Sequence, residues 1–179
     1  MRMKIWRFAS LVVTAAVLSV GAGRYTSVSE AVAAAPPAWM KVDAAHRHVA
    51  FTATASQGGA NGTLNFNGYA NGQMTVTVPA GWAVHIDFFN AGAGALPHSL
   101  EVIRKGKIPP QGVSPAIAGA ESQNLVPGIP PLQKDAFDFT ATPGGNYLWF
   151  CGVPGHGLSG MWGGFVVSTT AKAPSVTVK

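Results

Sequence analysis

The sequence predicts an all-β domain, a Greek-key β-sandwich or barrel of about seven or eight strands. Short stretches that alternate apolar and polar residues recur along the chain, and turn signals rich in Gly and Pro separate them. Charged residues make up only 11% of the 179 residues, and long polar stretches typical of surface helices are few. The fold class follows from these observations together.

Four strands are predicted in the first half of the chain, at residues 48–55, 63–67, 74–78 and 83–90. The last of them has the clearest pattern. Val84, Ile86 and Phe88 fall on one face and are predicted to be buried. His85 and Asp87 fall on the opposite face, which is predicted to meet solvent.

The second half contains four more predicted strands, at residues 99–104, 137–140, 146–151 and 163–168. Residues 105–135 are rich in Pro, Gly, Gln and Ser, and we predict a long irregular insertion there, with one short helix near 115–121. The tail, residues 169–179, is predicted to be loosely held.

Residues 1–35 have the order of a secretory signal. Arg2, Lys4 and Arg7 come first, an uncharged apolar run covers 8–23, and small residues follow at 31–35. The apolar run is shorter than the ~20 residues that a spanning helix usually needs. We predict a signal peptide or N-terminal membrane anchor at 1–35, and one domain at 36–179.

Positive charge belongs mostly to this leader, which holds four of the 12 basic and one of the 7 acidic side chains. In the remainder only Arg104, Lys105 and Lys107 cluster, and we interpret them as a solvated loop. A basic stripe for nucleic acid is missing from the sequence, so no nucleic-acid partner is expected.

The donor chemistry is concentrated at Cys151, His156 and Met161, which are separated by four residues each. Cys151 is the only cysteine, and an unpaired thiol in an exported protein needs a reason. Soft sulfur together with imidazole selects copper, and two His, one Cys and a distant Met form the blue copper pattern. Gly and Pro between the donors let the loop fold back around an ion.

A second histidine must come from elsewhere, and His98 is the best candidate. By two-residue alternation it shares an inward face with Leu100 and Val102. His85 is predicted to face solvent instead. A plain core role is the alternative for His98 and Met161. The predicted ligands of one type 1 copper per chain are His98, Cys151, His156 and Met161.

This arrangement resembles that of cupredoxins, in particular the rusticyanin and sulfocyanin group. The runs Phe-Cys-Gly-Val-Pro-Gly-His at 150–156 and Ser-Gly-Met-Trp at 159–162 look closest to sulfocyanins, and the resemblance covers roughly residues 75–167. Many cupredoxins have Asn after the first histidine, whereas this chain has Ser99, as rusticyanin-like proteins do. The resemblance implies a cupredoxin-like copper-binding domain over 36–179.

Together the residues and the resemblance predict a one-electron carrier, cycling between Cu(II) and Cu(I) in an extracytoplasmic respiratory chain. The alternative is an exported protein that handles copper without carrying electrons. We expect no enzyme activity, because a second copper would need further histidine ligands and no suitable cluster is present.

The resemblance implies redox proteins as partners: a cytochrome, another copper protein or a terminal oxidase. We expect the edge of the His156 ring to reach the surface within an apolar patch that includes Leu158, where a partner docks briefly. We further expect a monomer in the periplasm or on the outer face of the cell membrane. The N-terminal segment would attach it to the membrane if it is kept.

Overall fold

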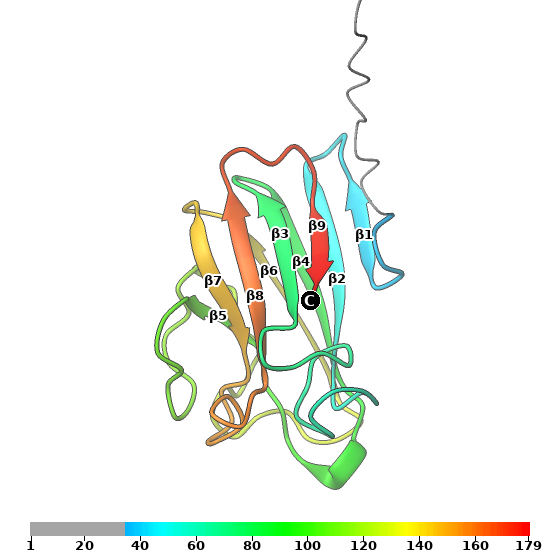
Figure 1. The fold of residues 1–179 in the computed structure, drawn as a ribbon, viewed down its shortest axis with the longest axis vertical. Coiled ribbons are helices and arrows are strands. Elements are labelled where there is room, and N and C mark those ends of the chain that lie inside the picture. Colours follow the sequence, from blue (N-terminus) through cyan, green and yellow to red (C-terminus); the bar gives the residue numbers. More distant parts are fainter. Residues whose placement is uncertain (1–34) are drawn as a thin grey trace, which may run out of the picture. The chain divides into compact units, whose positions relative to one another are not determined.

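The computed structural model describes residues 35–179, which form a sandwich of two β-sheets (Figure 1). The predicted all-β sandwich is confirmed, with nine strands in this range instead of the seven or eight expected. The predicted signal or anchor covers residues 1–35, and all but its last residue lie outside the described part. Within that part, no helix has the length and apolar character needed to cross a bilayer.

One sheet has four strands in the order β1-β2-β4-β6, and the other has five in the order β5-β7-β8-β3-β9. The strands are β1 (Met40–Asp43), β2 (His48–Ala55), β3 (Met74–Pro79), β4 (Ala83–Asn90), β5 (Glu101–Arg104), β6 (Lys134–Thr140), β7 (Gly145–Phe150), β8 (Trp162–Ser168) and β9 (Ser175–Val178). The pairs β2–β4 and β3–β8 are parallel, and the others are antiparallel.

The strand β4 shows how closely the alternation rule holds. Its bounds are those predicted, and Val84, Ile86 and Phe88 are buried while Asp87 is exposed. The other outward residue, His85, is half-buried and lies between two carboxylates. The prediction of an inward apolar face and an outward polar face is therefore confirmed.

Aromatic side chains join the two sheets across the core. Phe51 of β2 meets the edge of Trp149 of β7 at 5.7 Å between ring centroids, and Trp149 meets Phe165 of β8 at 5.8 Å. Phe139 of β6 contacts Phe165 from the first sheet at 6.0 Å. Burying such a side chain contributes roughly 2–3 kcal/mol. This core fixes the ends of β7 and β8, from which the ligand loop extends.

The predicted helix near residues 115–121 is wrong. The chain there pairs with the free edge of β5 instead: Val102 N donates to Ala120 O at 2.9 Å, and Ala116 N donates to Val102 O at 2.8 Å. Gly119, with φ of 78°, also interrupts any helix. An uncovered edge strand invites pairing with other chains, so this part of the insertion covers the edge.

Two further predictions are wrong: the strand at residues 63–67 and the loosely held tail at residues 169–179. Residues 63–67 form only two isolated bridges, both at Phe66, because Asn65 is turned to donate to the carbonyls of Gln57, Ala60 and Gly62. The tail is not loose, because β9 pairs along the edge of β3. The four residues of β9 give only a weak strand signal by themselves, and the sequence does not show that the edge of β3 is available to pair with them.

Candidate metal centre

The loop between β7 and β8 carries three of the four predicted ligands. Cys151 and Met161 lie directly beyond the ends of the two strands. Cys151 N donates to Met161 O at 3.1 Å, which closes the loop. Inside it, Met161 N donates to His156 O at 3.0 Å. The three predicted ligands are therefore brought together by backbone hydrogen bonds.

Two glycines allow this loop to turn so tightly. Gly160 has φ of 96°, in the left-handed region that glycine adopts without a steric penalty. A Cβ atom on Gly157 would overlap the ring of Phe150. The loop can thus fold against the end of β7, as the Gly-rich spacing predicted.

The second histidine is held by the insertion rather than by the sheet. His98 precedes β5 and forms an isolated bridge with Ile129. His98 N donates to Ile129 O at 3.1 Å, and Ile129 N donates to His98 O at 2.7 Å. The side chain is fully buried, as are Leu100 and Val102, so the predicted inward face is confirmed.

The donor atoms of the two imidazoles and the thiol converge. The Cys151 Sγ lies 3.6 Å from His156 Nδ1 and 3.9 Å from His98 Nδ1. All three donors lie within 4.8 Å of one another, and the ring centroids of the two histidines are 5.0 Å apart. Met161 is fully buried beside them and is joined to Cys151 and His156 through its backbone.

Burial sets the protonation of these donors. It lowers the pKa of His98 to about 4, with a smaller contribution from repulsion by His156. Burial likewise lowers the pKa of His156. The pKa of the Cys151 thiol is raised by burial, against the opposing effect of the Ser99 hydrogen bond. The imidazoles are therefore ready to bind a metal at neutral pH, whereas the thiol must first lose its proton.

Ser99 contacts the thiol through both its backbone and its hydroxyl, whose Oγ lies 4.0 Å from Cys151 Sγ. Ser99 N lies 3.5 Å from Cys151 Sγ. The hydroxyl donates to Leu125 O at 2.7 Å and accepts from Gly152 N at 2.9 Å. Ser99, the residue that follows the first histidine, therefore links the insertion to Gly152, the residue after the thiol.

The remaining histidines lie away from this centre. His85 Nδ1 lies 2.8 Å from Asp138 Oδ1 and its Nε2 lies 3.3 Å from Asp87 Oδ1, which raises the His85 pKa despite partial burial. His46 is exposed beside Asp43. Of the histidines, the structure brings only His98 and His156 together with Cys151.

Sequence reasoning missed Glu101, on β5. Its side chain is fully buried, and Oε1 accepts a hydrogen bond from Val113 N at 3.2 Å. Oε2 has no hydrogen-bond partner within residues 35–179. Burial raises the Glu101 pKa to about 7. Alternation places Glu101 on the face opposite to Leu100 and Val102, where it would meet solvent. The insertion covers this face as well, and therefore Glu101 is buried.

A buried thiol and two neutral imidazoles converge at one end of a β-sandwich, with a methionine beside them. These soft and borderline donors suit copper, and the set of two His, one Cys and a Met is that of a type 1 centre. Fold and donor set therefore define a cupredoxin, and its cofactor is one type 1 copper ion.

The chain belongs to the sulfocyanin family, because the sulfocyanin (SoxE) domain matches residues 37–178. The resemblance to sulfocyanins seen in the ligand loop is thus confirmed over nearly the whole described part.

Individual relatives agree with this assignment. Sulfocyanin of Sulfolobus acidocaldarius is 32% identical over 125 residues, which cover 64% of this chain and 61% of the relative. Rusticyanin of Acidithiobacillus ferrooxidans is 37% identical over 98 residues, which cover 52% of this chain and 49% of the relative. The chain thus spans about half to three-fifths of these relatives. The fold resembles that of auracyanin B, with a TM-score of 0.50 and 20% identity, over 74% of this chain and 96% of that one.

Proposed function

We propose that this protein carries single electrons in an extracytoplasmic respiratory chain, with His98, Cys151, His156 and Met161 as its copper ligands. The observation that carries the proposal is the convergence of one thiol and two imidazoles within 4.8 Å. Copper bound there would supply one-electron chemistry by alternating between Cu(II) and Cu(I).

The protein's own residues would hold the same geometry in both oxidation states. His98 is fixed by two backbone hydrogen bonds to Ile129, and the ligand loop is closed between Cys151 and Met161. Little rearrangement is then needed when the charge of the centre changes. Electron transfer of this kind needs no open position for a substrate, so the buried donors suit a carrier.

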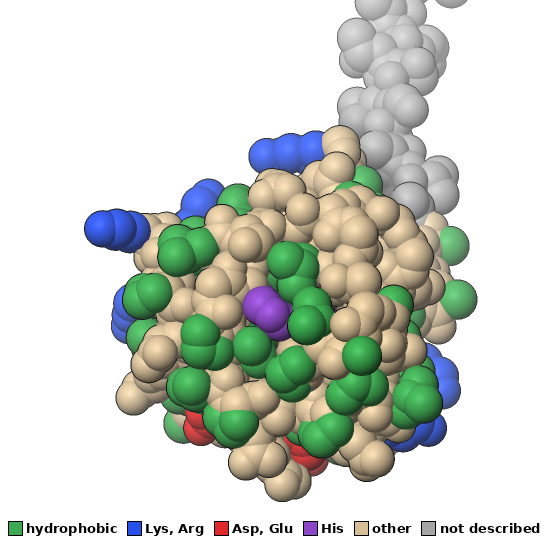
Figure 2. Space-filling view, turned by 90° about the horizontal axis from the view of Figure 1, so that it is seen from below, with side chains coloured by type: hydrophobic (Ala, Val, Ile, Leu, Met, Phe, Trp, Pro, Cys, Tyr) green, Lys and Arg blue, Asp and Glu red, His purple; other side chains and the backbone are tan. Residues whose placement is uncertain are grey.

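The route to a partner would run through His156. This residue is half-buried, unlike the fully buried His98, and Leu158 beside it in the loop is 61% exposed. Figure 2 views the end of the sandwich where the loops lie and shows an exposed histidine surrounded by hydrophobic side chains. Such a face suits brief docking, because electron-transfer encounters use small interfaces. A cytochrome, another copper protein or a terminal oxidase would be the partner.

Copper handling is the competing function. Transfer of the metal itself favours exposed donors that exchange readily, whereas His98, Cys151 and Met161 are fully buried here. Export through the N-terminal segment, with a periplasmic or membrane-attached location, forms part of the proposal and suits either function.

A visible spectrum tests the proposal first. The copper(II)-loaded protein should show an intense thiolate-to-copper band, and the Cys151→Ser variant should lack it. Stoichiometric copper binding without that band would move copper handling to first place. A redox titration of the loaded protein should then show a reversible one-electron step.

The docking face has its own test. Leu158→Asp should slow electron exchange with a cytochrome partner, since it places a charge in the apolar face. Val42→Asp on β1 is the control, because it places the same charge at an exposed apolar residue outside this loop. Equal rates for the two variants would contradict docking at His156.

A further inference from the structure

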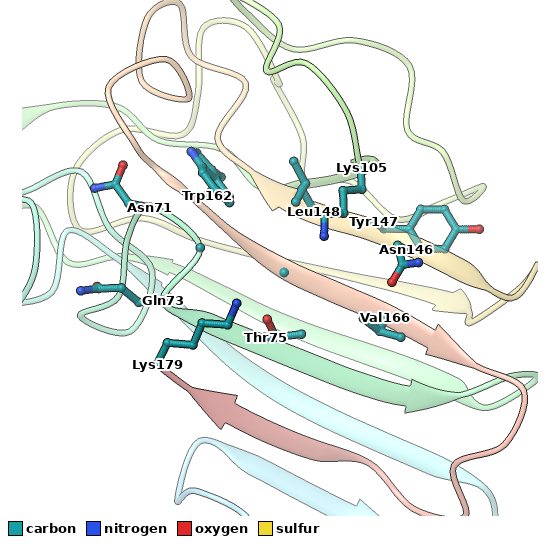
Figure 3. Close-up of a pocket in the computed structure, with 12 residues that line it drawn as sticks. Asn71, Gln73, Thr75, Lys105, Asn146, Tyr147, Leu148, Trp162, Val166 and Lys179 are labelled. Atoms are coloured by element: carbon teal, nitrogen blue, oxygen red, sulfur yellow. The ribbon is translucent and has the colours of Figure 1, made fainter.

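A groove crosses the outer face of the five-stranded sheet, away from the proposed docking face. It has a volume of about 330 Å³ and runs along β8, between β7 and β3. We call it the β8 groove, and the residues that matter for its chemistry are Gln73, Lys105, Asn146, Leu148, Trp162 and Lys179. Figure 3 shows Trp162 at one end of it, with Lys105 and Lys179 on opposite sides of β8.

The β8 groove exists because small residues lie where strands usually carry side chains. Gly164 points outward from β8 and leaves space beside Thr75, and a Cβ there would press on that side chain. Gly72 lies under the Trp162 ring in the same way. Trp162 and Leu148 therefore give the groove an apolar wall, while Asn146 and Gln73 offer polar groups.

The charged side chains that line the β8 groove are both basic. Lys105 and Lys179 line it, Arg104 and Lys107 flank Lys105 in the chain, and all four are exposed. Among residues 35–179, no acidic residue lines the groove. On the strands of this sheet the only acidic residue is the buried Glu101. The strands of the other sheet carry the exposed Asp43, Asp87 and Asp138 and the half-buried Asp135.

The β8 groove is also connected to the metal centre. Trp162 directly follows Met161, and its partner across the strands is Phe150, which precedes Cys151. Cys151 N donates to Met161 O at 3.1 Å, so both ligand-bearing segments meet next to Trp162. Electron tunnelling is favoured along covalent and hydrogen bonds over gaps. The path from Trp162 through Met161 O and Cys151 N to Cys151 Sγ consists of covalent bonds and this one hydrogen bond.

We infer that the β8 groove is a second docking site, for an acidic redox protein that exchanges one electron with the copper centre through Trp162. The inference rests on the proposed carrier function. Carboxylates of the partner would meet the lysines, and an apolar group would meet the partly exposed Trp162. In the reduction, one electron leaves the partner and Cu(II) becomes Cu(I), with no bond made or broken. Neither His156 nor Leu158 lines the groove, so this site differs from the His156 face.

The experiment uses reduced plant-type ferredoxin as an acidic one-electron donor protein, without oxygen and at low ionic strength. Bleaching of the blue band of the copper(II)-loaded protein gives the rate. Lys105→Glu combined with Lys179→Glu should slow the reaction about tenfold, at the lower end of electrostatic steering. The control combines Lys41→Glu and Lys172→Glu, which make the same charge change outside the groove and should alter the rate less than about twofold. Equal slowing in both double variants would overturn the inference.

Carbodiimide coupling provides a readout that does not depend on rates. Lysines that meet carboxylates of the bound ferredoxin become cross-linked, and mass spectrometry identifies them. We expect Lys105 and Lys179, and cross-links found only at Lys41, Lys134 or Lys172 would refute the site. A normal blue band in all variants separates these outcomes from a failure of the carrier function, in which no blue band forms in any of them.

Discussion

Glu101→Gln should change how the stability of the protein depends on pH. The Glu101 carboxyl is fully buried, and its Oε2 has no hydrogen-bond partner within residues 35–179. Burial raises its pKa from 4.5 to about 7, repulsion from Glu121 adds to the shift, and the Val113 hydrogen bond opposes it. The folded protein therefore prefers the protonated carboxyl.

The sign and size of the effect follow from proton linkage. Above pH 4.5 the unfolded chain releases this proton, whereas the folded protein keeps it up to about pH 7. The folded state then binds more protons, so stability falls as pH rises through this window and levels off above it. The shift corresponds to a loss of about 3 kcal/mol at most. Glutamine is neutral throughout and removes this dependence.

Urea denaturation of the copper-free wild type and of Glu101→Gln at pH 4 to 8 measures the effect. The buried amide of the variant adds an unsatisfied donor that costs about 1–3 kcal/mol, but this offset is independent of pH. Both proteins contain His98 and His156, so their titrations cancel in the difference. The variant should gain on the wild type from pH 4.5 to 7. Parallel profiles, or a gain toward acid instead, would refute a buried carboxyl with a raised pKa.

Three further predictions concern the ligand loop and its supports. Ser99→Ala should lower the unfolding free energy by about 1–3 kcal/mol, because Gly152 N loses the acceptor that lies 2.9 Å away; urea denaturation beside Ser99→Thr, which keeps the hydroxyl, checks this. Asn61→Ala should shift the relative intensities of the visible copper bands, because Asn61 Nδ2 donates to Ser159 O at 2.7 Å and so anchors the loop; an unchanged spectrum would show that this anchor is dispensable. Copper affinity should rise about tenfold per pH unit, because the pKa of the Cys151 thiol is raised and its proton must leave; chelator competition at pH 6 and 7 measures the slope, and Cys151→Ser should abolish it.

Most of the metal centre could be predicted from the sequence because three of its four expected ligands lie close together in the chain. Cys151, His156 and Met161 lie in one short Gly-rich loop, and their spacing alone indicates a common ion. His98 required one more step, the alternation that places it with Leu100. The structure brings His98, Cys151 and His156 together and buries Met161 beside them.

What could not be predicted depends on partners that are distant in the chain. β9 forms only because β3 has a free edge, and residues 115–121 pair with β5 instead of forming a helix. Glu101 is buried from the side that alternation assigns to solvent, because the insertion covers it. These features arise from long-range packing, on which local periodicity gives no information.

The insertion between β5 and β6 limits how this site can be transplanted. It supplies both hydrogen bonds that hold His98, through Ile129, and its Gly112 N donates to Gly152 O at 2.7 Å, next to the thiol. Loop grafting that moves only the short segment between β7 and β8 into another β-sandwich would omit these hydrogen bonds from the insertion. A faithful chimera would have to carry two segments that are far apart in sequence, and any homologue that lost the insertion would need another way to anchor its first histidine.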